Sequence, residues 1–192
     1  MMEALAGLDQ GGGLVALLDT GAGGVRCELD ERRAPGAVAL FVGLARGRAR
    51  WRDPVDGRAT RRPLYRDLAF HRVIDGVLVQ TGCPVGDGTG HPGYRIPVET
   101  RADDREMLSR GGALVLARYT PPPGRADPSP PPAGHVLGSQ FGVTLTDMGH
   151  LTGEVTVFGR CGDLDVLRRI AAVRDASTRP RLLRVRIVRD PR

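Results

Sequence analysis

A glycine-rich segment near the middle of the chain has the spacing of a phosphate-binding loop. Gly88, Gly90 and Gly93 match the pattern G-x-G-x-x-G, in which backbone N–H groups at a helix N-terminus hold the pyrophosphate of a dinucleotide. That chemistry requires the loop to open a helix, but Pro92 and Pro97 bracket an extended segment here. Without the helix the pattern describes a turn-rich loop, and we expect neither a dinucleotide nor any other cofactor.

The four histidines show neither the spacing nor the neighbours that are typical of a metal site. They are His71, His91, His135 and His150, and no two of them lie four residues apart or group with cysteines. Zinc sites usually combine closely spaced histidine and cysteine ligands. Serines are few and no G-x-S-x-G motif is present, so a Ser-His-Asp hydrolase has no support. We therefore expect no metal ion and no hydrolytic triad.

The three cysteines, Cys27, Cys83 and Cys161, are odd in number and widely spaced. They form no C-x-x-C pair, so the pattern favours buried, reduced thiols over a disulfide framework or a zinc site. The N-terminus carries Glu3 and Asp9 where a secretory signal would be basic. No segment is apolar for long enough to span a membrane. These features predict a cytoplasmic protein with no membrane partner.

All 28 basic residues are arginines, and the formal net charge is +6. Two runs of them could contact the phosphates of a nucleic acid. The runs comprise Arg46, Arg48, Arg50 and Arg52, and Arg181, Arg184, Arg186 and Arg189. Trp51 apart, no aromatic residue interleaves with these runs to stack on bases. We interpret the arginines as an ordinary charged surface with no specific nucleic-acid partner, and nucleic-acid binding remains the least favoured alternative. An isolated charge on an alternating strand, such as Arg72, would by the same reasoning be a solvated group.

The hydrophobic pattern predicts many short strands. Residues 25–30 and 183–187 alternate apolar and polar side chains, as strands with one buried face do. The predicted strands are 14–18, 25–30, 68–73, 77–80, 113–117, 139–145, 155–160 and 183–187. Two helices are expected, one near 35–46 opened by Pro35 and one near 163–171 opened by an Asp163 cap.

Eight short strands and 27 glycines favour a mainly β fold over a helical bundle. We predict a closed, eight-stranded antiparallel β-barrel with two capping α-helices, because closure leaves no unpaired sheet edge. Interior positions should include Val25, Cys27, Phe41, Phe158 and Ile187.

The domain is expected to span residues 14–189, after an N-terminal extension at 1–13. Residues 120–136 contain seven prolines, which cannot donate ladder hydrogen bonds. We interpret this segment as a Pro-rich loop inserted between two strands of the one domain.

Four segments resemble cyclophilins, and bacterial members most closely, and they follow one another along the chain in the family's order. The central one reads FHRVIDGVLVQ at 70–80 and continues as GDGTGHPGY at 86–94. Residues 19–45 look like the family's first hairpin and helix, 138–141 like its Gly-Ser-Gln-Phe strand, and 150–159 like its ending up to Val-Phe-Gly. An Arg-Pro-x-Tyr sequence at 62–65 is similar to the lead-in of bacterial members. The resemblance covers roughly residues 14–189.

This resemblance implies a peptidyl-prolyl cis-trans isomerase that acts on X-Pro bonds of peptides and proteins during folding. Arg72 would donate a hydrogen bond to the prolyl nitrogen, and Gln80 would hold the substrate backbone. The other positions implied to bind substrate are Val77, Leu78, Ala117, Arg118, Gln140, Gly142, His150, Leu151 and Val155. The partner would be a proline-containing segment, the protein a monomer, and no cofactor would be needed.

Several of these positions depart from the family pattern. Val77 and Gly142 stand where the family has aromatic walls of the proline pocket, Arg118 replaces an asparagine, and Val155 replaces a histidine. We therefore expect isomerase activity to be reduced. The alternative is a catalytically degenerate module of the same fold that binds a peptide or protein. The Pro-rich loop, whose ends flank the groove, would either lie over it or be a mobile surface loop.

Overall fold

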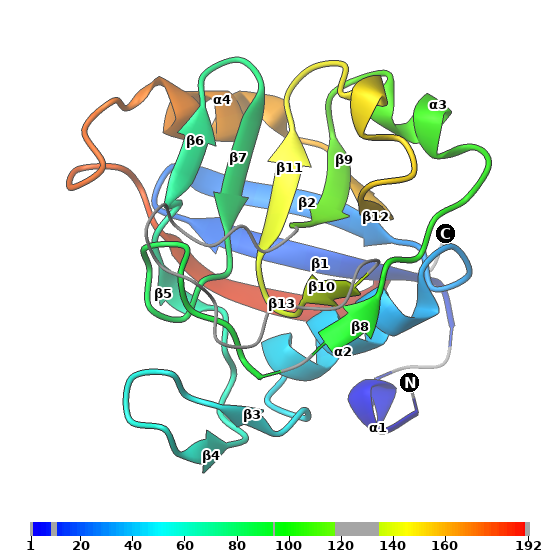
Figure 1. The fold of residues 1–192 in the computed structure, drawn as a ribbon, viewed down its shortest axis with the longest axis vertical. Helices are drawn as coiled ribbons and strands as arrows, with labels where there is room; N and C mark the ends of the chain where they lie inside the picture. Colours follow the sequence, from blue (N-terminus) through cyan, green and yellow to red (C-terminus); the bar gives the residue numbers. More distant parts are fainter. Residues whose placement is uncertain (1, 9–10, 94, 118–134, 191–192) are drawn as a thin grey trace.

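The computed structural model describes residues 2–8, 11–93, 95–117 and 135–190. Within them, nine strands form one antiparallel sheet that curls around a hydrophobic core (Figure 1). In order across the sheet, the strands are β5 (Arg66–Leu68), β13 (Leu182–Asp190), β1 (Gly13–Thr20), β2 (Gly23–Leu29), β12 (Thr156–Cys161), β9 (Ala113–Leu116), β11 (Phe141–Thr144), β7 (Leu78–Thr81) and β6 (Arg72–Ile74).

The two edge strands of this sheet, β5 and β6, are joined by residues 69–71 alone, yet no ladder pairs them. The carbonyls of the connection are bonded elsewhere. Ala69 O accepts the Thr81 hydroxyl at 2.9 Å, and Phe70 O accepts Arg179 Nη1 at 3.0 Å. The single strand predicted at 68–73 is therefore wrong. The mainly β, antiparallel fold is confirmed, but the sheet has nine strands and is curled without being closed by hydrogen bonds.

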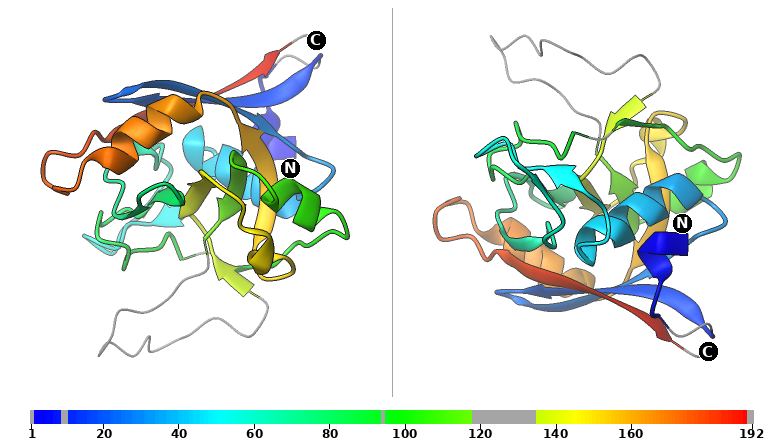
Figure 2. Two further views of the ribbon diagram at one scale, coloured as in Figure 1. Left: turned by 90° about the horizontal axis from the view of Figure 1, so that it is seen from above. Right: turned by 90° about the horizontal axis from the view of Figure 1, so that it is seen from below.

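Two helices cover opposite ends of the curled sheet (Figures 1 and 2), as predicted. α2 (Pro35–Ala45) is almost entirely buried, and its first N–H groups are capped from outside the helix. Glu99 accepts from Gly36 N at 3.0 Å and from Ala37 N at 2.8 Å. In α4 (Leu164–Ala172) the buried positions fall on one face. Asp163 precedes α4 but does not cap it, since its carboxylate accepts from Arg26 N at 3.1 Å.

An aromatic cluster fills the centre of the core. The ring of Phe41 lies 5.0 to 5.3 Å from the rings of Tyr65, Phe141 and Phe158, measured between centroids. These side chains come from α2, the segment before β5, β11 and β12, so one contact group joins distant parts of the chain. The interior positions predicted from the sequence, Val25, Cys27, Phe41, Phe158 and Ile187, are all buried.

Smaller elements lie outside the main sheet, and the sequence analysis missed them. They are α1 (Met2–Leu5), α3 (Asp104–Leu108), the 3-10 turn η1 (Gly149–Leu151), the pair β3 (Trp51–Arg52) and β4 (Ala59–Thr60), and the pair β8 (Arg95–Pro97) and β10 (His135–Leu137). The last two residues of the predicted loop 120–136 thus belong to β10; the rest of that loop lies outside the described residues. No helix among the described residues is long and apolar enough to cross a membrane.

Cys27 and Cys161 face each other across β2 and β12 and form a disulfide. The expectation of reduced thiols was therefore wrong for these two residues, although both are buried as predicted. Cys83 is the free cysteine, and it is buried. The disulfide ties together two strands whose cysteines are separated by 134 residues in the sequence.

Reduction of the Cys27–Cys161 disulfide should lower the free energy of unfolding by about 2–4 kcal/mol, because the cross-link restrains the unfolded chain over a long loop. Urea unfolding with and without reductant measures the change, and the double variant Cys27→Ala/Cys161→Ala should not respond to reductant. Thiol titration of the unreduced, unfolded protein should detect Cys83 alone. Detection of all three cysteines before reduction would contradict the disulfide.

Candidate active site

The hairpin of β6 and β7 places Arg72 and Gln80 side by side. The two residues are directly paired across the strands, so their side chains leave the same face of the sheet. A tight turn sets this register: Val77 N donates to Ile74 O at 2.9 Å, and Gly76 has a φ of +68°. The position of Arg72 beside Gln80 is therefore determined by the local turn.

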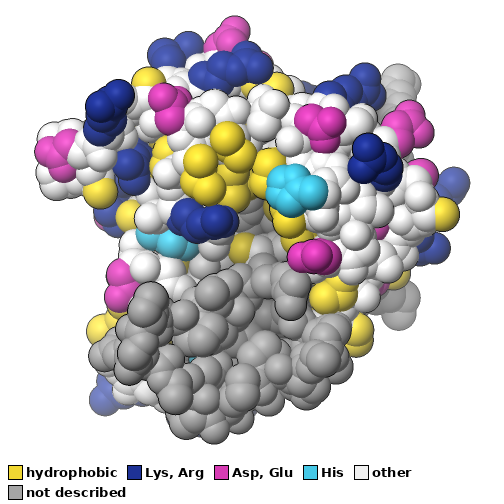
Figure 3. Space-filling model, turned by 45° about the horizontal axis from the view of Figure 1, so that its top comes forward, with side chains coloured by type: hydrophobic (Ala, Val, Ile, Leu, Met, Phe, Trp, Pro, Cys, Tyr) yellow, Lys and Arg dark blue, Asp and Glu magenta, His cyan; other side chains and the backbone are white. Residues whose placement is uncertain are grey.

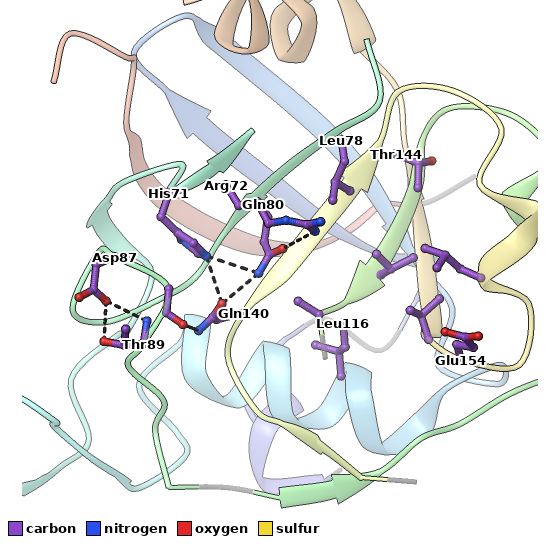
Figure 4. A pocket seen from close by; sticks show the side chains of 16 residues that line it. His71, Arg72, Leu78, Gln80, Asp87, Thr89, Leu116, Gln140, Thr144 and Glu154 are labelled. Atoms are coloured by element: carbon purple, nitrogen blue, oxygen red, sulfur yellow. Dashed lines mark hydrogen bonds between the residues drawn. The ribbon is translucent and has the colours of Figure 1, made fainter. Parts of the chain in front are cut away.

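The next strand, β11, brings a third polar side chain to the same place. Gly142 pairs with Gln80, and Gln140 directly precedes β11. Together these strands form one wall of a pocket of about 450 Å³ (Figure 4). Its lining residues are His71, Arg72, Leu78, Gln80, Asp87, Gly88, Thr89, Val115, Leu116, Ala117, Gln140, Gly142, Thr144, Leu151, Glu154 and Val155.

The amide of Gln140 is oriented by two backbone carbonyls of the glycine-rich loop. Its Nε2 donates to Gly88 O at 2.8 Å and to Gly90 O at 3.0 Å, which uses both of its N–H groups. Its Oε1 must then face the other way, where it accepts from Gln80 Nε2 at 3.0 Å. Gln80 in turn presents its Oε1 to Arg72 Nη1 at 3.4 Å. Figure 4 shows this chain of bonds running from the loop to Arg72.

His71 also contacts Gln140 and is part of the same network. Its Nε2 lies 3.1 Å from Gln140 Oε1. That oxygen only accepts, so this contact needs a proton on Nε2. The same nitrogen lies 3.4 Å from Gln80 Nε2, which would need an acceptor, and the shorter contact decides the tautomer. Burial lowers the pKa of His71 from its ordinary value, and the nearby Arg72 guanidinium acts in the same direction. His71 is therefore a neutral donor in this site.

The other end of the pocket is lined mainly by aliphatic side chains, and none of the described lining residues is Phe, Tyr or Trp. Leu78, Leu151 and Val155 supply its hydrophobic surface. A Cβ atom added to Gly142 would lie only 2.9 Å from Leu78 Cδ1, so the Leu78 side chain covers the space where a larger residue would stand. Figure 3 shows hydrophobic side chains gathered around a hollow in the surface, with basic and acidic side chains at its margin.

Most of the residues proposed from the sequence lie in this one pocket, and two of those that the structure describes do not. The ones that line it are Arg72, Leu78, Gln80, Ala117, Gln140, Gly142, Leu151 and Val155. Val77 sits in the hairpin turn and does not line the pocket, but it packs against a buried cluster that includes the lining residues Val115 and Val155. The exposed His150 belongs to η1 and is not among the lining residues. Arg118 lies outside the described residues.

Sequence reasoning missed several residues that line the pocket. They are His71, Asp87, Gly88, Thr89, Val115, Leu116, Thr144 and Glu154. A regular strand through residue 71 would point His71 and Arg72 to opposite faces. Instead the chain is irregular before β6, and both side chains reach the pocket. In the sequence, only the glycine-rich motif pointed to the loop residues. The loop forms a wall of this pocket and, as predicted, opens no helix. The described residues contain no group of three His, Cys, Asp or Glu side chains suited to a metal ion.

Solved structures share this architecture. A cyclophilin type peptidyl-prolyl cis-trans isomerase of Cryptosporidium parvum superposes with a TM-score of 0.68 at 22% sequence identity, over 93% of this chain and 99% of that protein. A second structure of it, obtained in the presence of the dipeptide Ala-Pro, gives a TM-score of 0.66. At this level of identity the match establishes the fold alone.

Sequence comparison goes further. The model of the cyclophilin type peptidyl-prolyl cis-trans isomerase family matches residues 15–189. Peptidyl-prolyl cis-trans isomerase B of Streptomyces anulatus is 33% identical over 168 residues, which cover 88% of this chain and 87% of that protein. A peptidyl-prolyl cis-trans isomerase of Synechococcus elongatus is 35% identical over 91% of this chain and 97% of its own length. The chain belongs to the cyclophilin family of peptidyl-prolyl cis-trans isomerases.

Proposed function

We propose that this chain isomerises X-Pro peptide bonds at the pocket between β6, β7 and β11, with Arg72 as the catalytic residue and low turnover. The observation that carries the proposal is the exposed guanidinium of Arg72, bonded to Gln80 in a pocket whose other end is lined mainly by aliphatic side chains. A fixed cation beside an apolar surface suits a substrate that is hydrophobic at the proline ring and polar at the adjoining amide.

The chemistry follows from the electronic structure of the amide bond. Resonance makes the C–N bond partly double and sets a rotation barrier of about 18–20 kcal/mol. When the bond twists, the lone pair of the prolyl nitrogen is released from resonance and can accept a hydrogen bond. Arg72 would donate to that nitrogen only in the twisted state, which selectively stabilises the transition state. The guanidinium offers only N–H donors, so Arg72 would act through a hydrogen bond without transferring a proton.

Gln80 has a positioning role in this proposal as well as a binding role. Its Nε2 is bonded to Gln140 and its Oε1 to Arg72, so Gln80 directs the guanidinium toward the pocket. Ala117 lines the pocket beside Gln140, whose carbonyl accepts the Ala117 N–H at 2.9 Å, and the backbone of a bound peptide would pass here. Gln140 holds Gln80 in place.

The apolar end of the pocket, lined by Leu78, Leu151 and Val155, would hold the proline ring. Aliphatic side chains without an aromatic wall give the ring less contact area. Removing a buried phenyl ring costs about 3–5 kcal/mol in a protein core. Even half of that amount would weaken proline binding by roughly one to two powers of ten. We therefore propose weak substrate binding and correspondingly low turnover.

The second candidate is a binding module that recognises a proline-containing segment without accelerating its isomerisation. The described lining residues favour it, because none of them is Phe, Tyr or Trp. An NMR exchange experiment on an X-Pro peptide separates the two functions, because it reports binding and cis–trans exchange in the same sample. Accelerated exchange establishes the enzyme, and binding without acceleration establishes the module.

We further propose a monomer that has no specific nucleic-acid partner. Ion pairs within the chain support the absence of a nucleic-acid partner, because they engage arginines of the C-terminal run. Arg184 and Arg186 both contact Asp19, and Arg189 contacts Glu31. Arginines paired in this way release few counterions from a polyanion.

A cytoplasmic location is also proposed, supported by the free thiol of Cys83. The Cys27–Cys161 disulfide argues against it, since such bonds are rare in reducing compartments.

Replacing Arg72 by alanine should lower kcat/KM at least tenfold, which corresponds to about 1.4 kcal/mol of barrier. Peptide binding should change much less, because the hydrogen bond to the prolyl nitrogen is made mainly in the transition state. A protease-coupled assay on an X-Pro peptide measures the rate, and NMR titration measures the affinity. Arg66→Ala, an exposed arginine on the other edge strand, is the matched control. Equal activity of Arg72→Ala and the wild type would place the chemistry elsewhere.

The rate should also have a defined pH dependence. Since burial lowers the pKa of His71, the unfolded chain takes up this proton at higher pH than the folded protein does. The contribution of His71 to stability should therefore stay constant down to about pH 6.5, the ordinary histidine pKa, and decrease below it. kcat/KM should decrease only at the lower pH at which the folded protein takes up the proton. Imidazole NMR signals, assigned with a His71→Gln variant, follow the titration directly. Protonation of His71 at or above pH ~6.5 would contradict the burial argument.

A further inference from the structure

Cys83 follows β7 and begins the glycine-rich loop, and its side chain is fully buried. The sulfur accepts the N–H of Gly86 at 3.3 Å and the N–H of Gly90 at 3.2 Å. The thiol also points to Asp87, with Sγ 3.9 Å from Oδ1. One sulfur atom thus contacts the loop at three places, and the loop closes around it.

This loop supplies the carbonyls that orient the active site. Gly88 O and Gly90 O accept both N–H groups of Gln140, and the orientation of Gln140 determines that of Gln80. Gly90 therefore takes part in both contacts. Its N–H is bonded to the Cys83 sulfur, and its carbonyl is one of the two that hold Gln140. A hydrogen bond makes each step of the path from Cys83 to Arg72: sulfur to Gly90, Gly90 to Gln140, Gln140 to Gln80, and Gln80 to Arg72.

The loop has little freedom to adopt another conformation around a smaller side chain. The N–H of Gly90 is buried, so without the sulfur it would have no acceptor at that position. The chain is also tightly packed there. A Cβ atom at Gly90 would lie 2.6 Å from Val85 Cγ2, and one at Gly88 would lie 2.9 Å from His71 Cδ2. A change at Cys83 should consequently be transmitted to the two carbonyls.

We propose that Cys83 is a positioning residue for the isomerase reaction, acting through the loop and Gln140 on Arg72. The proposal rests on the function proposed above and adds a residue that lies outside the pocket. Because the sulfur acts on the donor that stabilises the twisted bond, its loss should reduce kcat more than it raises KM.

The test compares Cys83→Ala, which removes the acceptor, with Cys83→Ser, which keeps a smaller one. We expect kcat/KM of Cys83→Ala to fall about tenfold, mainly in kcat, and Cys83→Ser to recover part of it. The side-chain amide signals of Gln140 in ¹⁵N NMR spectra should shift in Cys83→Ala and move back toward the wild type in Cys83→Ser. Val185→Ala, a similar loss of buried volume on β13, controls for general destabilisation and should leave those signals and kcat unchanged.

A double-mutant cycle with Gln140→Ala identifies the route. If Cys83 acts through Gln140, the double variant should be no slower than Gln140→Ala alone. Additive effects, or unchanged Gln140 amide signals in Cys83→Ala, would overturn the proposal. If the wild type itself shows no isomerase activity, the proposed function fails, and the amide signals of Gln140 then decide alone whether Cys83 positions the site.

Discussion

A side-chain amide has a donor end and an acceptor end, and the arrangement of this site depends on which way one such amide points. Gln140 donates both of its N–H groups to the glycine-rich loop, so its oxygen is left to face Gln80 and His71. Reversing it would place two donors against Gln80 Nε2 and an oxygen against two carbonyl oxygens. The bond to Gln140 sets the orientation of Gln80, and the bond to Gln80 sets the orientation of Arg72. Loop, amides and guanidinium therefore form a single directed chain.

The aromatic core supports this chain of hydrogen bonds by holding the backbone next to Gln140. Tyr65 packs against Phe41, and its hydroxyl donates to Ser139 O at 3.0 Å, one residue before Gln140. Burial raises the pKa of Tyr65, so the hydroxyl remains a donor. Ser139 in turn donates to Gly82 O at 2.7 Å. Only glycine fits at position 82, because a Cβ atom there would lie 2.3 Å from Ser139 O and φ is +89°. The core thus positions the backbone on which the polar network is built.

The two ends of the pocket are assembled differently, and this matters for function. The polar end is held by a hydrogen-bond network with few alternatives. The apolar end is made of aliphatic side chains, with Leu78 leaning over Gly142. In the proposed mechanism, transition-state stabilisation depends on the first end and substrate affinity on the second. A protein built in this way can keep the chemical step of its family while binding simple proline peptides weakly.

Local patterns in the sequence determined the strands, the two larger helices and the order of motifs. Alternation of side chains specifies which residues face the core, so Val25 and Ile187 were placed correctly, and the pairing of Arg72 with Gln80 follows from a short turn. Contacts between residues far apart in the chain were decided by the tertiary structure. The register of β2 against β12 joins Cys27 to Cys161, a pairing that spacing does not indicate.

The same holds for the residues around the catalytic arginine. His71 lines the pocket because the chain leaves the sheet at residues 69–71, where long-range hydrogen bonds from Thr81 and Arg179 replace the ladder. Cys83 gains its role only when the loop folds back on it. A hydrogen-bond partner is defined by position in space, and periodicity along the chain carries no information about partners that folding brings together from distant segments.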